Sequence, residues 1–140
     1  MRILLLNGPN LGSLGRRQPE VYGSETLDEI VESCRAHALE RGALLEAMQS
    51  NHEGALIDRL EQLDYDGLIV NFGALSHTSY ALHDALLSAG RPTVEVHISD
   101  ITSREPWRHT SVTAPATQHQ VIGHGWRGYL EAIDWLLSPR

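Results

Sequence analysis

The apolar residues of this chain fall into short runs, separated by longer stretches in which apolar and polar residues alternate with helical spacing. The short runs are rich in Leu, Ile and Val, and they predict strands over residues 2–7, 43–49, 67–71, 93–98 and 120–123. The amphipathic stretches predict helices over residues 26–41, 53–63, 78–88 and 126–137. Strands and helices therefore alternate along most of the chain.

Residues typical of helix ends support these boundaries. Thr26 and Glu29 have the spacing of a capping box at the start of the first helix. Ser50 or Asn51 is expected to cap the second helix, because short polar side chains accept hydrogen bonds from the free amides of a first turn. Gly90 is placed to end the third helix, since glycine readily adopts the left-handed conformation found there.

The alternation of strands and helices predicts an α/β fold. Consecutive strands joined by helices form right-handed βαβ units, which build a parallel sheet with helices on both faces. Five strands favour the flavodoxin-like order 2-1-3-4-5, and we expect residues 1–140 to form a single domain. Two long irregular stretches, at residues 8–24 and 99–118, interrupt the pattern. Loops of this length in a compact domain usually carry function.

Polar side chains collect where the predicted strands end. In an open α/β sheet, ligands bind beyond the carboxyl ends of the strands. Amides, hydroxyls and imidazoles are frequent in the segments that follow the first four strands, which are Asn7-Gly8-Pro9-Asn10, Ser50-Asn51-His52-Glu53, Asn71-Phe72-Gly73-Ala74-Leu75-Ser76-His77 and Glu95-Val96-His97-Ile98-Ser99. Ser50 and Asn51 are interpreted as helix caps. A solvated surface position for His52 and a turn-stabilising role for Asn10 stay open as alternatives to a binding site at this edge of the sheet.

Glu95 and His97 form the most informative pair at this edge. They are two positions apart on a predicted strand, so their side chains point to the same face. A carboxylate beside an imidazole orients the ring and favours its charged form. The pair is therefore interpreted as functional.

The first long loop combines glycines with reactive side chains. Residues 11–23 contain Arg16, Arg17 and Tyr22 together with three glycines, Gly12, Gly15 and Gly23. Such a loop is typical of a mobile lid over an active site. A guanidinium beside a phenol stabilises the phenolate and makes it a usable base. The residues alone leave a second interpretation open, in which the loop is flexible and its arginines are solvated.

Composition narrows the class of protein. The chain has 140 residues, 41% of them hydrophobic, and a net charge of −7. The negative charge argues against a nucleic-acid partner, because binding to phosphates requires a basic face. No apolar run reaches the roughly 20 residues that span a bilayer, and the first apolar run is too short for a signal peptide. We therefore expect no membrane partner.

The cysteine and lysine contents add two constraints. The one cysteine, Cys34, lies at helical spacing from Ile30, Val31 and Ala38, so we expect a buried core thiol and a reducing cytoplasmic location. The chain contains no lysine, and all 11 basic residues are arginines. Schiff-base catalysis through a lysine amine and a Walker-type phosphate loop are therefore both excluded.

Several blocks of residues resemble those of the type II 3-dehydroquinate dehydratases. The blocks occur in order along the chain: Asn7-Gly8-Pro9-Asn10-Leu11, Leu14-Gly15, Arg17-x-Pro19-x-x-Tyr22-Gly23, Gln49-Ser50-Asn51-His52-Glu53-Gly54, Asn71-x-Gly73-Ala74-x-Ser76-His77-Thr78-Ser79, Glu95-Val96-His97-Ile98-Ser99, Arg104-Glu105-x-Trp107-Arg108 and Gly123-His124-Gly125-Trp126-Arg127-Gly128-Tyr129. Four positions depart from the usual pattern of the family, namely Gly12, Pro106, Thr110 and Val112. None of them is a principal catalytic position.

The resemblance implies a lyase that converts 3-dehydroquinate to 3-dehydroshikimate by trans-dehydration through an enolate. This step belongs to the shikimate route to aromatic amino acids and to quinate catabolism. It also implies a flavodoxin-like fold, a homo-oligomer that is a dodecamer built from trimers, and no cofactor or metal. The other enzyme type for this reaction forms a lysine Schiff base, which this chain cannot do.

The resemblance also implies a role for each matching residue. Tyr22 is the base that removes the C2 proton, Arg17 on the lid favours its phenolate, and Asn10 holds a water that stabilises the enolate. His97, oriented by Glu95, protonates the departing C1 hydroxyl. The remaining expected contacts to substrate come from Asn71, His77 and Arg108 to its hydroxyls, from Ile98 and Ser99 to its carboxylate, and from Asp84 to the site of a neighbouring subunit.

Three other classes of protein fit the sequence poorly. A flavin mononucleotide carrier requires a loop rich in Ser and Thr after the first strand, but residues 8–15 contain one serine. A phosphorelay receiver requires an aspartate at the end of the third strand and a lysine, whereas this chain has Asn71 and no lysine. Gly123, Gly125 and Gly128 have the spacing of a dinucleotide-binding motif but precede the last helix, so close packing of that helix on the sheet explains them better.

The eight histidines include no His-x-x-x-His pair, so no metal site is expected.

Overall fold

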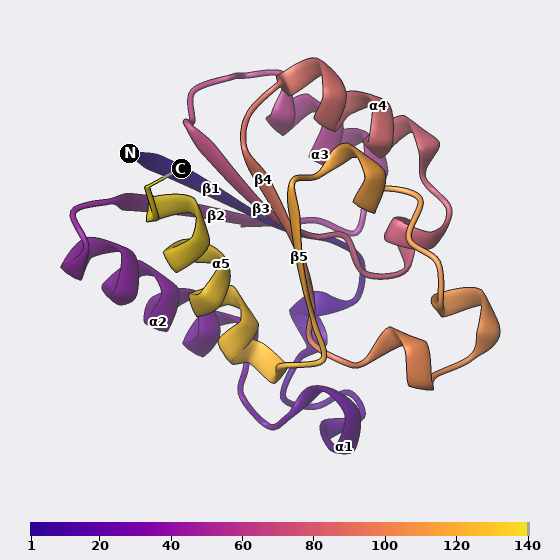
Figure 1. Cartoon of the computed structure of the whole chain (residues 1–140). Helices are drawn as coiled ribbons and strands as arrows, with labels where there is room; N and C mark the ends of the chain where they lie inside the picture. The colour runs from indigo at the N-terminus through magenta and orange to yellow at the C-terminus, as the bar shows by residue number, and fades with distance from the viewer. Residues whose placement is uncertain (140) are drawn as a thin grey trace.

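In the computed structural model, which describes residues 1–139, five parallel strands form one sheet. The strands are β1 (Arg2–Asn7), β2 (Leu44–Gln49), β3 (Gly67–Asn71), β4 (Thr93–His97) and β5 (His119–Ile122). Their order across the sheet is β2-β1-β3-β4-β5, and every neighbouring pair is parallel (Figure 1). The predicted flavodoxin-like α/β fold with strand order 2-1-3-4-5 is confirmed.

Helices cover both faces of this sheet (Figure 1). One face packs against α2 (Leu27–Glu40) and α5 (Gly128–Leu137), and the other packs against α3 (Glu53–Leu60) and α4 (Tyr80–Ala89). A fifth helix, α1 (Pro19–Tyr22), is a single short turn within the first long loop. The second long loop contains three 3-10 turns, at Ile101–Ser103, Pro106–Arg108 and Ala114–Ala116. None of the helices in residues 1–139 is long and apolar enough to cross a membrane.

The central strand β1 shows why its residues form a buried strand. Ile3 and Leu5 belong to the core under α2 and α5, whereas Leu4 and Leu6 belong to the core under α3 and α4. Successive side chains of a strand point to opposite faces, so a continuous apolar run suits a strand that is covered on both sides. Each of these four side chains is at most 1% exposed.

Several predicted helix ends are confirmed and others need correction. The capping box is present, because Thr26 and Glu29 each accept a hydrogen bond from the other's backbone amide. The prediction that Ser50 or Asn51 caps α3 is wrong, because His52 occupies that position without a side-chain hydrogen bond. Helix α3 also ends at Leu60 instead of 63, since Leu63 has a left-handed backbone with φ 53°.

The remaining differences at helix ends are small. Helix α4 starts at Tyr80, two residues later than predicted, because Ser79 is its N-cap and accepts a hydrogen bond from Leu82 N. It ends before Gly90, as predicted. The last helix begins at Gly128, after a 3-10 turn at Gly125–Arg127.

Two sequence interpretations about the core are confirmed. A Cβ on Gly128 would lie 3.2 Å from Val121 Cγ1 and 3.4 Å from Val96 Cγ1, so this glycine allows α5 to pack closely on the sheet. Cys34 is fully buried on α2, and burial raises the pKa of its thiol to about 12. A thiol with such a pKa stays protonated at neutral pH, which suits a core residue and not a nucleophile.

Candidate active site

A cleft lies at the carboxyl ends of β1, β3 and β4, which is where the sequence predicts a binding site. Its walls come from the first long loop, the turn after β3, the end of β4 and the start of the second long loop. The lining residues are Pro9, Asn10, Leu11, Arg17, Tyr22, Asn71, Gly73, Ala74, His77, His97, Ile98, Ser99, Ile101, Arg104 and Arg108. Nine of the eleven predicted site residues are among them; the other two, Glu95 and Asp84, lie outside the lining.

The floor of the cleft depends on close contact between the ends of β1 and β3. Gly8 N donates a hydrogen bond to Asn71 O at 2.7 Å, and a Cβ on Gly8 would lie 2.5 Å from Phe72 O. Only glycine permits such a close approach of two backbones. Below this contact, Tyr129 on α5 donates to Asn7 Oδ1 at 2.6 Å and accepts from Asn71 Nδ2 at 2.9 Å. These bonds fix the orientation of the Asn71 amide.

The loop that carries Asn10 is held by the end of β2. Asn10 has a left-handed backbone with φ 70°, and its backbone N–H donates to Asn51 Oδ1 at 3.0 Å. Asn51 Oδ1 also accepts from Gln49 Nε2 at 3.1 Å, and Gln49 Nε2 lies 3.1 Å from Gly8 O. Asn51 therefore positions the Asn10 loop, instead of capping α3 as the sequence suggested.

Tyr22 contacts two arginines. The guanidinium carbon of Arg17 lies 4.7 Å from the centre of the Tyr22 ring, and that of Arg104 lies 5.2 Å from it. Arg104 Nη1 also donates to Tyr22 Oη at 2.6 Å and to Ser99 Oγ at 3.2 Å. Two guanidiniums therefore lie beside one phenol. The hydrogen bond to the phenol oxygen comes from Arg104, a residue to which the sequence analysis assigns no role.

Glu95 and His97 form a buried hydrogen-bonded pair at the end of β4. His97 Nε2 donates to Glu95 Oε2 at 2.8 Å, and the two residues are 5% and 0% exposed, respectively. Burial alone would raise the pKa of Glu95. Hydrogen bonds from His97, Thr113 and Ser111, with the charge of His97, outweigh this effect and hold the pKa below its ordinary value. Because Nε2 faces Glu95, Nδ1 is the ring nitrogen left to exchange a proton with a ligand in the cleft.

His77 stands beside His97 with a different environment. The two rings are stacked with their centres 6.1 Å apart, and His77 Nδ1 donates to Thr110 O at 2.9 Å. Burial lowers the pKa of His77, and nearby His97 and Arg108 lower it further, against the effect of the Thr110 hydrogen bond. A neutral His77 therefore presents Nε2 to the cleft as a hydrogen-bond acceptor, which suits a ligand hydroxyl.

Arg108 and Ser99 add donors to the cleft. The Arg108 guanidinium stacks on Trp107 at 4.0 Å, and its Nε donates to Glu105 Oε1 at 3.1 Å. Ser99 follows Ile98 directly after β4, and both line the cleft, so two backbone amides and the Ser99 hydroxyl belong to the same part of its wall.

Asp84, by contrast, is an exposed residue of α4 and lines a separate hollow between α3 and α4.

The structure adds four residues that the sequence analysis did not single out for this site. Arg104 and Tyr129 lie within blocks that resemble the family, and Ser111 and Thr113 lie in the long loop expected to be functional. Their contacts join residues that are distant in sequence, so no local pattern could reveal them. Among residues 1–139, no group of three or more His, Cys, Asp or Glu side chains could hold a metal ion.

Comparisons with known proteins agree with this architecture. Residues 1–137 match the family described as dehydroquinase class II. A 3-dehydroquinate dehydratase of Roseiflexus castenholzii is 56% identical over 142 residues, covering 100% of this chain and 90% of the relative. A catabolic 3-dehydroquinase of Aspergillus clavatus is 49% identical over 134 residues, covering 94% of this chain and 89% of the relative.

Solved structures show the same similarity in three dimensions. The crystal structure of type II dehydroquinase from Butyrivibrio crossotus superposes with a TM-score of 0.97 and is 43% identical, covering 99% of this chain and 98% of that one. The strand order, the cleft at the carboxyl ends of the strands and the match over residues 1–137 lead to one conclusion. The chain belongs to the class II dehydroquinase family.

Proposed function

We propose that this protein is a type II 3-dehydroquinate dehydratase, a lyase that converts 3-dehydroquinate to 3-dehydroshikimate and water by trans-dehydration. The step is shared by the shikimate route to aromatic amino acids and by quinate breakdown. The observation that carries the proposal is one cleft with a phenol in contact with two guanidiniums and an imidazole paired with a buried carboxylate. These are the base and the acid that an elimination of water requires.

The first step is removal of a proton from C2 of the substrate by Tyr22. This proton lies next to the C3 ketone, so the electron pair left by the broken C–H bond moves to the ketone oxygen and forms an enolate. The phenolate takes the proton and becomes a phenol. Donors near the new negative charge stabilise the enolate, and a water held by Asn10 supplies one.

The second step is departure of the C1 hydroxyl. The enolate re-forms the ketone, a double bond forms between C1 and C2, and the C1–O bond breaks. Hydroxide is a poor leaving group, so the His97 imidazolium donates a proton to it and water leaves. The Glu95 carboxylate stabilises the imidazolium before this transfer. Return of one proton from Tyr22 to His97 restores the enzyme.

The other cleft residues bind the substrate. His77, Asn71 and Arg108 contact its hydroxyls, and the amides of Ile98 and Ser99 with the Ser99 hydroxyl hold its carboxylate. The neutral state that burial favours for His77 suits a hydroxyl donor. Residues 1–140 act as a single catalytic domain in the cytoplasm. The dehydration needs no metal or organic cofactor.

The test of this proposal is an ultraviolet assay with 3-dehydroquinate, because the product is a conjugated enone that absorbs where the substrate does not. We expect turnover by the purified protein. We also expect full activity after treatment with borohydride in the presence of substrate, because a chain with no lysine forms no side-chain imine to be reduced. Absence of product, or inactivation with covalent trapping of substrate, would reject the assignment.

We further propose a homo-oligomer, namely a dodecamer built from trimers in which Asp84 reaches the cleft of a neighbouring subunit. Two exposed residues on one face of α4 support a subunit contact there, since Asp84 follows the 70% exposed Tyr80 by one helical turn. Sedimentation at micromolar concentration should give a mass near twelve chains. A protein that sediments as a monomer at that concentration would contradict the proposed assembly.

A further inference from the structure

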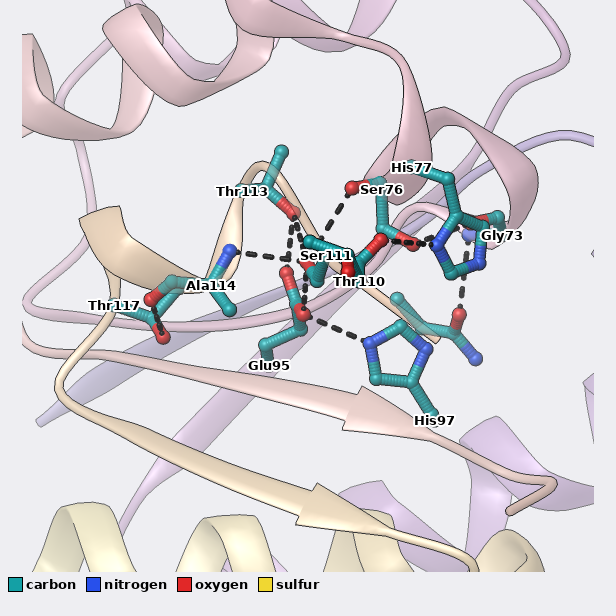
Figure 2. Close-up of polar contacts among 11 residues, drawn as sticks. Gly73, Ser76, His77, Glu95, His97, Thr110, Ser111, Thr113, Ala114 and Thr117 are labelled. Atoms are coloured by element: carbon teal, nitrogen blue, oxygen red, sulfur yellow. Dashed lines mark hydrogen bonds and ion pairs between the residues drawn. The ribbon is translucent and has the colours of Figure 1, made fainter. Parts of the chain in front are cut away.

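The Glu95 carboxylate is held by more than its partner His97. Thr113 Oγ1 donates a short hydrogen bond to Glu95 Oε1, and Ser111 Oγ donates to Glu95 Oε2 at 2.7 Å (Figure 2). Oε2 is the oxygen that also accepts from His97 Nε2. Glu95 and Thr113 are both 0% exposed, so bulk solvent does not reach these oxygens. Each carboxylate oxygen therefore has a fixed donor from the second long loop.

The direction of the Ser111 hydroxyl is set by the backbone around it. Ala114 N donates to Ser111 Oγ at 3.0 Å. A backbone amide can only donate, so the hydroxyl proton of Ser111 must point elsewhere, and the nearest acceptor is Glu95 Oε2. Ser111 Oγ lies farther from Ser76 O, at 3.3 Å.

The segment that carries these hydroxyls is anchored on both sides. Val112 N donates to Ser76 O at 2.7 Å, and His83 Nδ1 donates to Val112 O at 2.8 Å. The preceding carbonyl, Thr110 O, accepts from His77 Nδ1. Residues 110–113 therefore contact both histidines of the cleft, His77 directly and His97 through Glu95 (Figure 2).

We propose that Ser111 and Thr113 are positioning residues for the dehydration, which fix the Glu95 carboxylate and thereby aim the His97 imidazole at the departing hydroxyl. This inference rests on the proposed function and extends it to residues that do not line the cleft. The physical reason is that a carboxylate with one oxygen unpaired in a buried site turns toward its remaining donors or takes up a proton. Either response weakens its hold on the imidazole.

Thr113→Val provides the main test, because valine has nearly the shape of threonine and lacks the hydroxyl. We expect kcat for 3-dehydroquinate to fall about tenfold or more, since a hydrogen bond to a charged group is lost, while KM stays close to that of the parent. Thr113→Ser keeps a hydroxyl and should restore most of kcat. Ser111→Ala should lower kcat in the same way. It replaces Thr113→Val as the test if that variant does not fold, which thermal denaturation would show.

A matched control lies in the same turn. Thr117 Oγ1 donates to Ala114 O at 2.7 Å and does not contact Glu95 (Figure 2). Thr117→Val therefore removes a threonine hydroxyl close to the network and should leave kcat unchanged. If Thr113→Val and Thr117→Val reduce kcat equally, the effect is one of general stability and the positioning role is rejected.

A double-mutant cycle tests whether the effect passes through Glu95. Thr113→Val should lower kcat much less in a Glu95→Gln background than in the parent, because the carboxylate on which Thr113 acts is already absent. Equal effects in both backgrounds, or parent-like kcat in Thr113→Val and Ser111→Ala, would overturn the inference. A parent protein that is inactive on 3-dehydroquinate would instead overturn the proposed function itself.

Discussion

Tyr22→Phe should reduce kcat for 3-dehydroquinate by about 10²- to 10⁴-fold or more while leaving substrate affinity nearly unchanged. Phenylalanine keeps the ring that contacts Arg17 and Arg104 but removes the oxygen proposed to take the C2 proton. Arg104 donates a 2.6 Å hydrogen bond to the Tyr22 oxygen, and the Arg17 guanidinium carbon lies 4.7 Å from the ring centre, so both guanidiniums contact the proposed base.

The measurement is steady-state turnover together with substrate binding by calorimetry. Arg17→Ala should also lower kcat although Tyr22 remains, and Arg17→Lys should not fully restore it, because an ammonium lacks the planar guanidinium face. Tyr65→Phe is the matched control, since the Tyr65 hydroxyl bonds Leu60 O outside the cleft. Substantial turnover by Tyr22→Phe would show that another group is the base.

His97→Ala should lower kcat by about 10²- to 10⁴-fold, the usual contribution of general acid catalysis. Without the imidazolium, hydroxide must leave unprotonated from a cleft that has lost its acid. Glu95→Gln should lose less, because Glu95 orients the ring and stabilises its charge but transfers no proton to the substrate. The order of the two effects distinguishes the acid from the residue that orients it.

His124→Ala is the control for this series, because His124 pairs with Glu131 on the surface and does not line the cleft. Its turnover should match that of the parent. Hydrogen–deuterium exchange at C2 separates the two steps, since His97→Ala should still exchange this proton through Tyr22. Near-normal dehydration by His97→Ala would assign the acid to a different residue.

The fold was predictable because its signals are local and repeated. Continuous apolar runs such as residues 2–7 mark strands covered on both faces, and Thr26 with Glu29 marks the start of α2. The residues that cap the helices were less predictable. Asn51, for example, has a side chain suited to capping the start of α3, but it does not occupy the cap position. In the structure its amide oxygen accepts hydrogen bonds from Asn10 and Gln49 instead.

The candidate site was predictable in its location and less so in its contacts. Strand ends identify the edge of the sheet, and the pair Glu95 and His97 follows from the two-residue period of a strand. The contact from Arg104 to Tyr22 spans 82 residues, and that from Thr113 to Glu95 crosses from a loop to a buried strand. Such pairings depend on the course of two long loops, which residue periodicity does not encode.

The hydrogen bond from Tyr129 to Asn7 has a consequence for how this protein becomes active during synthesis. The two residues are 122 positions apart, and the bond joins the last helix to the end of the first strand directly below Asn71. Contacts of such long range form only after the loop between them has closed. The side-chain amide of Asn71, which we propose contacts the substrate, therefore acquires its final orientation when α5 docks. A nascent chain that still holds α5 inside the ribosome already contains every proposed catalytic residue but lacks the Tyr129 hydrogen bonds beneath the cleft.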